Sequence, residues 1–155
     1  MLQRIQTLYL LIVAGLFIAV IFLPLASISS GSDAYMFDVT GLNTLTQPSE
    51  LIYPTWALLA IAAIVVILAF CVIFMYRKRV LQIRLCVFNM LIMIGFCILF
   101  GFYVWQIGKL PQFPDMKPTI SIWSSFPVIA LIINYLAIRN IGADEVLVRS
   151  LNRLR

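Results

Sequence analysis

The stretch Pro54–Tyr76 reads PTWALLAIAAIVVILAFCVIFMY and contains no charged residue. An apolar run of this length is typical of a helix that crosses a lipid bilayer, because about 20 helical residues span the hydrocarbon core. Three more such runs lie at about residues 5–26, 85–107 and 119–138. The first is longer than the apolar core of a typical signal peptide, so we expect a retained helix. The sequence therefore predicts an all-α membrane protein with a bundle of four transmembrane helices.

The composition of the whole chain supports this class. Of its 155 residues, 63% are hydrophobic and 11% are charged, whereas soluble domains contain roughly 25% charged residues. The length favours a single membrane domain. This balance excludes a water-soluble globule, a disordered chain and a disulfide-rich secreted scaffold.

The distribution of basic residues predicts the orientation of the helices. Nine of the 11 Lys and Arg residues lie before the first span, in the loop 77–84 or in the tail 139–155. The other side has only Lys109 and Lys117. Because loops rich in Lys and Arg stay in the cytoplasm, we expect both termini to be cytoplasmic.

Two loops are expected on the outer side. The loop 27–53 starts with a serine-rich, turn-like stretch and then alternates, with Tyr35, Phe37 and Val39 on one face of a strand and Asp38 on the other. A turn at Gly41, or at the pair Leu42–Asn43, would complete a short β-hairpin. Two strands alone are marginally stable, so the hairpin needs to pack on the bundle or on a partner. It is either a lid over the helix ends or a docking surface.

The second outer loop, 108–118, contains three prolines and is predicted to be a rigid connector. Pro127 falls inside the fourth span as delimited above, so we expect it to bend that helix. The bend either serves packing or opens a cleft toward lipid.

The predicted spans contain amides and hydroxyls but no Asp, Glu, Lys or Arg. Ion-coupled carriers and charged pores place ionisable groups at membrane depth, so the sequence argues against both classes. Asn89 follows Arg84 by five residues, and Asn134 precedes Arg139 by five, which gives the two amides the same depth. We expect an interhelical polar pair; the alternative is a pocket for a polar ligand.

Sequence motifs for catalysis are missing. The chain has no His, no phosphate-binding loop and no metal-ligand spacing. Its three cysteines, Cys71, Cys86 and Cys97, lie in apolar runs, as structural thiols do. We therefore expect neither an enzyme nor a cofactor or metal, and no nucleic-acid partner.

The cytoplasmic face contains the candidate binding residues. Basic groups there attract anionic lipid, although the topology alone would also explain their presence. After Gly142, leucines recur at helical spacing with arginines around them, which predicts a short amphipathic helix lying on the inner leaflet or against another protein. The candidate contacts with lipid or a partner are Arg77, Lys78, Arg79, Asp144, Glu145, Arg149, Arg153 and Arg155.

Both ends of the chain carry a family resemblance. The opening MLQRIQTLYLL and the closing DEVLVRSLNRLR resemble a bacterial family of uncharacterised four-span inner-membrane proteins. Relatives often have a basic residue where this chain has Ala143, and an acid where it has Asn152. The resemblance implies a bacterial cytoplasmic membrane protein and does not imply any particular activity.

These observations predict a small polytopic protein that works by binding, as an accessory or scaffold subunit of a membrane complex. Its expected partners are membrane lipids and another membrane protein. The alternative is a carrier or binding protein for a neutral or lipid-like ligand, which would use the Pro127 bend and the level of Asn89 and Asn134.

Overall fold

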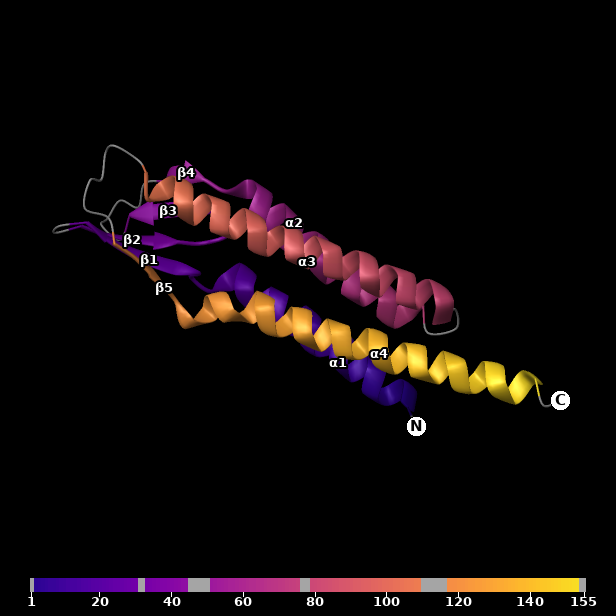
Figure 1. Cartoon of the computed structure of the whole chain (residues 1–155). Helices are drawn as coiled ribbons and strands as arrows, with labels where there is room; N and C mark the ends of the chain where they lie inside the picture. The colour runs from indigo at the N-terminus through magenta and orange to yellow at the C-terminus, as the bar shows by residue number, and fades with distance from the viewer. Residues whose placement is uncertain (1, 31–32, 45–50, 76–78, 110–116, 154–155) are drawn as a thin grey trace.

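Four long helices dominate the structure. The computed structural model describes residues 2–30, 33–44, 51–75, 79–109 and 117–153. The helices are α1 (Leu2–Phe22), α2 (Trp56–Phe74), α3 (Arg79–Ile107) and α4 (Phe126–Arg153), and all four are long and apolar enough to cross a membrane. Both chain ends lie at one end of the elongated bundle, the terminus end, and a small β-sheet lies at the other, the sheet end (Figure 1).

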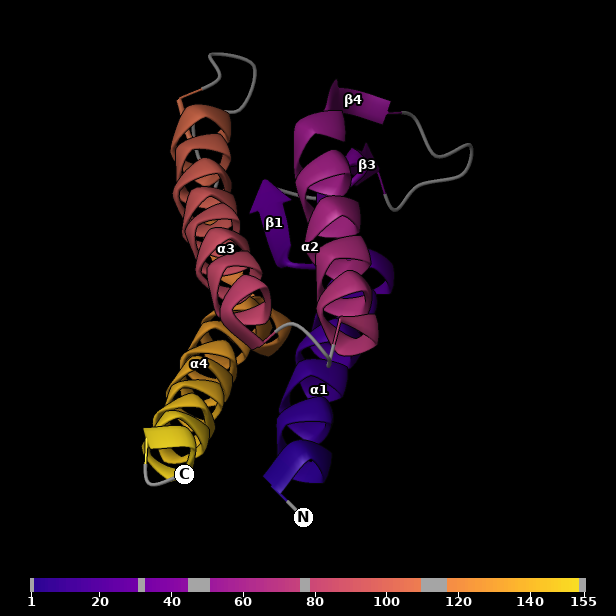
Figure 2. The same cartoon turned by 90° about the vertical axis from the view of Figure 1, so that its right-hand side faces the viewer.

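Each helix contributes one narrow stripe to the interior. α1 and α3 each pack against both α2 and α4, and Figure 2 shows this arrangement from the terminus end. Alternating steps of four and three residues separate the buried positions of α2, as in left-handed bundles; these positions are Leu58, Ala62, Val65, Ala69 and Val72.

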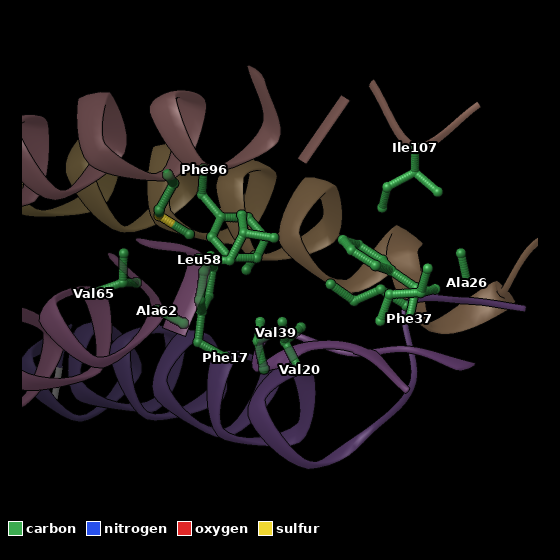
Figure 3. Close-up of a cluster of buried hydrophobic side chains, with 14 of the residues drawn as sticks. Phe17, Val20, Ala26, Phe37, Val39, Leu58, Ala62, Val65, Phe96 and Ile107 are labelled. Carbon is green, nitrogen blue, oxygen red and sulfur yellow. The ribbon is translucent and has the colours of Figure 1, made fainter. Parts of the chain in front are cut away.

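The interior contains two apolar clusters. The sheet-end cluster is the larger and includes Phe17, Leu58 and Phe96, which meet between the helices (Figure 3). The rings of Phe17 and Phe96 lie 5.5 Å apart, edge to face, and join α1 to α3. The terminus-end cluster consists of Leu10, Val72, Cys86, Ala137 and Ile141.

The sheet has five antiparallel strands in the order β4-β3-β2-β1-β5. α3 reaches past the sheet ends of α1 and α4, and the sheet lies beside this part of α3 (Figure 1). The ring of Phe37 is 5.9 Å from that of Phe100 on α3, so the sheet forms part of the core. The strands are β1 (Ala26–Ser30), β2 (Asp33–Phe37), β3 (Gly41–Thr44), β4 (Leu51–Pro54) and β5 (Lys117–Ile120).

The predicted hairpin is present as β2 and β3, and Tyr35, Phe37 and Val39 are buried as expected. Its turn comes earlier than either predicted position, Gly41 or the pair Leu42–Asn43. Asp38 and Gly41 exchange both backbone hydrogen bonds, at 2.9 and 3.2 Å, so residues 39–40 form the turn. The described part of the serine-rich stretch, predicted as turns, belongs to β1 instead, which pairs with β2 on one side and β5 on the other.

The chain is not yet α-helical where the fourth span was predicted to start, at about residue 119. Thr119 and Ile120 belong to β5, a short 3-10 helix covers Ile122–Ser125, and α4 begins only at Phe126. Pro127 is therefore the second residue of α4 and does not bend the middle of a helix. A proline is tolerated in the first turn because its nitrogen has no intrahelical bond to make there.

The tail is not a separate helix. α4 continues through Gly142 to Arg153, and a single glycine costs a helix only about 1 kcal/mol. At 1.5 Å per residue, these 28 residues extend roughly 42 Å, whereas the hydrocarbon core of a bilayer is about 30 Å thick. Figure 1 shows α4 reaching past the terminus ends of the other three helices.

Candidate functional site

Polar side chains are buried at both ends of the bundle. Among the residues whose burial is described, the buried polar group comprises Gln6, Thr55, Gln82, Asn89 and Asn134. All of them are amides apart from the hydroxyl of Thr55. None of the Asp, Glu, Lys and Arg residues in this described set is buried.

Two of the amides, both glutamines, join neighbouring helices toward the terminus end. Nε2 of Gln6 on α1 donates to the carbonyl oxygen of Asn140 on α4, at 3.4 Å. Nε2 of Gln82 on α3 donates to the carbonyl oxygen of Val72 on α2, also at 3.4 Å. The composition of the spans gave no reason to single out either glutamine, because both lie at or beyond the predicted helix ends.

Asn89 and Asn134 are fully buried, between the two apolar clusters. They are not hydrogen bonded to each other: Nδ2 of Asn134 donates to the carbonyl oxygen of Cys86 on α3, at 3.0 Å. Nδ2 and Oδ1 of Asn89 and Oδ1 of Asn134 have no hydrogen-bond partner. The level of the two amides follows from the sequence, but the choice of partner does not.

A groove with a volume of about 370 Å³ lies between α3 and α4 at the terminus end. Arg84 and Glu145 bring opposite charges to it, and Gly142 brings no side chain. A groove of this kind can hold a zwitterionic group against an apolar wall. Its lining residues are Val80, Ile83, Arg84, Gly142, Glu145 and Val146.

The sequence marked Arg84 only as a topology determinant, and the structure adds it to the candidate site. Val80, Ile83 and Arg84 share one face of α3 because residues three and four apart are neighbours on a helix. That spacing predicts a shared face, but it does not predict that α4 lies opposite this face of α3.

The predicted charged residues fall into three groups. Asp144 and Glu145 are half-buried on α4, and Glu145 lines the groove. Arg77, Lys78 and Arg155 lie outside the described residues. The described residues include the backbones, but not the side chains, of three further positions, Arg79 at the start of α3 and Arg149 and Arg153 on α4.

The sheet end has its own polar contact. The hydroxyl of Thr55, just before α2, lies 3.1 Å from the carbonyl oxygen of Val39 and 3.3 Å from that of Asp38. Nδ2 of Asn43 donates to Oδ2 of Asp38 at 3.5 Å. Burial raises the pKa of the Asp38 carboxyl above its ordinary value of 3.8, and the hydrogen bond from Asn43 opposes this shift. Thr55 thus attaches the β2–β3 turn to the start of α2.

The comparison with protein families gives one match. The model of the family described as "Domain of unknown function (DUF4293)" matches residues 2–154. No curated protein and no solved structure matches the chain. The matched range includes all of the opening and closing segments quoted above except Met1 and Arg155. Since the match covers almost the whole chain, this protein belongs to the DUF4293 domain family.

Proposed function

We propose that this protein is a multi-pass protein of the bacterial cytoplasmic membrane, with both termini in the cytoplasm, and that it acts as an accessory or scaffold subunit. Four apolar helices support the location, and the concentration of Lys and Arg before, between and after them supports the orientation. The partner is a second membrane protein that binds the tail, residues 139–155.

The observation behind this proposal is the continuity of α4. The groove brings Val80 and Ile83, in the first turns of α3, beside Gly142 and Val146 on α4. The part of α4 after Val146 therefore extends roughly 10 Å beyond that level. A helix that continues straight from a transmembrane segment points away from the membrane and not along it. This geometry favours a tail that binds a protein in the cytoplasm over a tail that lies flat on the inner leaflet.

The chemistry of the tail supports the same choice. All four basic residues after the predicted fourth span are Arg, although Lys occurs elsewhere in the chain. Arg binds a carboxylate through two parallel hydrogen bonds, which Lys cannot reproduce, whereas an anionic lipid surface accepts either residue. The adjacent Asp144 and Glu145 would be repelled by an anionic leaflet. The partner's surface is therefore acidic.

The test is crosslinking in native membranes followed by copurification and mass spectrometry. Changing Arg149→Lys together with Arg153→Lys should weaken recovery of the partner and leave membrane insertion and liposome binding intact. If the lysine variant keeps every partner, and the corresponding Arg→Ala variant releases the tail from liposomes, the tail is an electrostatic lipid anchor and the proposal fails.

A backbone variant tests the continuity itself. Ala143 is exposed on α4, next to Gly142 of the groove and six residues before Arg149. Ala143→Pro should interrupt the helix there and reduce partner recovery, while Ala143→Ser, the matched control, should not. Equal recovery of the partner with both variants would show that a straight tail is not required.

The groove between α3 and α4 favours a second candidate, a carrier or binding protein for a lipid-like ligand. Arg84 suits a phosphate, Glu145 an amine, and Val80 and Ile83 an acyl chain. Native mass spectrometry of the protein extracted from membranes should then detect bound phosphatidylethanolamine. Gly142→Leu, which fills the groove, should abolish the bound lipid, whereas Gly95→Leu on α3 should not. If both variants keep the bound lipid, the groove is not its binding site.

A further inference from the structure

The buried amides differ in how their hydrogen bonds are satisfied. Gln6, Gln82 and Asn134 each donate to a backbone carbonyl of a neighbouring helix. Asn89 is different, because neither atom of its amide has a partner, and Oδ1 of Asn134 has none either. Asn89 and Asn134 have no exposed surface, so bulk solvent does not reach these three atoms.

The two asparagines face the interior at the same level. The carbonyl of a helical residue points toward the residues three and four positions further along. The bond from Asn134 to the Cys86 carbonyl therefore brings the Asn134 amide to the turn of α3 that carries Asn89. Ala130 and Ala137, one turn away from Asn134 on either side, are buried with it. Both of these neighbours have the short side chain of alanine.

Burying an amide without a hydrogen-bond partner is strongly unfavourable, and most of all among apolar side chains. The three unpartnered atoms are two carbonyl oxygens and one amide nitrogen. A water molecule matches this set: it has two O–H donors for the oxygens and a lone pair for an amide N–H. Buried waters typically make about three such bonds to protein groups that have no other partner.

We propose that one water molecule is bound between Asn89 and Asn134 and bridges α3 and α4. It donates one O–H to Oδ1 of Asn89 and the other to Oδ1 of Asn134, and it accepts a hydrogen bond from Nδ2 of Asn89. The bridge lies between the sheet-end and terminus-end clusters, where apolar contacts alone would leave the two amides unsatisfied. This water site is independent of the scaffold role and of the identity of any partner.

Solid-state NMR of the full-length, unmodified protein in lipid bilayers tests the site without a mutation. Magnetisation transferred from water protons should reach the side-chain amide of Asn89 several times faster than that of Gln82. Gln82 is the matched control, because it is also buried on α3 but donates to the Val72 carbonyl. Transfer to Asn89 that is no faster than transfer to Gln82 would overturn the proposal.

Radiolytic footprinting provides a second measurement. X-ray pulses convert bound water into hydroxyl radicals that oxidise the side chains nearest to it, and Cys86 and Met93 lie one turn on either side of Asn89, both fully buried. Their oxidation should fall several-fold in Asn89→Leu and stay unchanged in Gln82→Leu. Equal oxidation in the wild type and Asn89→Leu would mean that no water is bound. A direct bond between the two asparagines predicts that same result.

Discussion

Single polar side chains hold the parts of this molecule together. Thr55 is the clearest case, because its hydroxyl is fully buried within hydrogen-bonding distance of two carbonyl oxygens of the β2–β3 turn. Its backbone N–H also donates to the carbonyl oxygen of Thr40, at 3.1 Å. One residue thus links the loop that precedes α2 to a turn 15 residues earlier in the chain.

Removing this hydroxyl should destabilise the protein. Thr55→Val keeps the shape of the side chain but leaves buried carbonyl oxygens with one donor fewer, which costs about 1–3 kcal/mol. Thr55→Ser keeps the hydroxyl and should cost less. Unfolding of both variants in detergent by increasing SDS would measure the difference. A valine variant as stable as the wild type would show that the contact contributes nothing.

Asp38 should make stability depend on pH. Because burial raises its pKa above 3.8, the folded protein binds the proton more tightly than the unfolded chain does. The free energy of unfolding therefore rises as the pH falls through the raised pKa toward 3.8, and this gain is lost at higher pH. Asp38→Asn removes the effect.

The measurement compares the wild type with Asp38→Asn at several pH values. The asparagine variant should be the more stable protein near neutral pH, and the difference should shrink as the pH is lowered. A difference that grows on acidification would contradict the assigned direction of the pKa shift.

Alternation of side chains was sufficient to predict the burial of Tyr35, Phe37 and Val39. The environment of Asn89 could not be predicted in the same way. Spacing along a helix gives the depth and face of an amide, but its hydrogen bonds depend on side-chain torsions and on which carbonyl of α4 or α3 comes within reach. Arg84 was missed as a site residue for a related reason, since the groove exists only where two helices meet.

At the scale of elements, each edge strand of the sheet contains a proline. Thr55 bonds to Thr40 and Ser121 to Leu25, and hydrogen-bonded pairs alternate along an antiparallel ladder. Pro54 on β4 and Pro118 on β5 therefore occupy positions at which the backbone nitrogen points away from the neighbouring strand. A proline there removes no internal bond and denies a donor to an incoming strand. The prolines therefore disfavour extension of the sheet by a further strand.

The pairing of β1 with β5 can be tested by a disulfide. Ser27 and Thr119 are register partners on exposed positions of adjacent strands, and partners in an antiparallel pair lie about 5.5 Å apart at Cα, within disulfide range. Ser27→Cys with Thr119→Cys should crosslink under mild oxidation. The control pair, Ser27→Cys with Ile120→Cys, points to opposite faces and should not. Efficient crosslinking of the control pair alone would mean a different register.

The helices were largely predictable, whereas only the β2–β3 hairpin of the sheet was. Long apolar runs identify α1, α2 and α3 because uncharged runs of about 20 residues are typical of membrane-spanning helices. β1 and β5 are short and rich in Ser, Lys, Pro and Thr, and their partners are about 90 positions apart in the chain. Thr119 and Ile120 continue an apolar run yet form a strand, because β1 offers them backbone partners.

At the scale of the whole molecule, the two longest helices project from opposite ends. α3 extends past its neighbours at the sheet end, where the sheet packs against it, and α4 extends at the terminus end (Figure 1). The sheet packs along one side of the sheet-end projection. The projecting end of α4 carries Arg149 and Arg153, so the scaffold proposal assigns the partner to that end.

In the proposed orientation, the sheet lies on the outer side of the cytoplasmic membrane and the projecting end of α4 lies in the cytoplasm. Lys109 and Ala143 are exposed at opposite ends of the bundle and can each be changed to cysteine after Cys71, Cys86 and Cys97 are replaced by alanine. A membrane-impermeant maleimide should label Lys109→Cys in intact bacterial cells, and Ala143→Cys only after permeabilisation. Labelling of Ala143→Cys in intact cells would contradict the account.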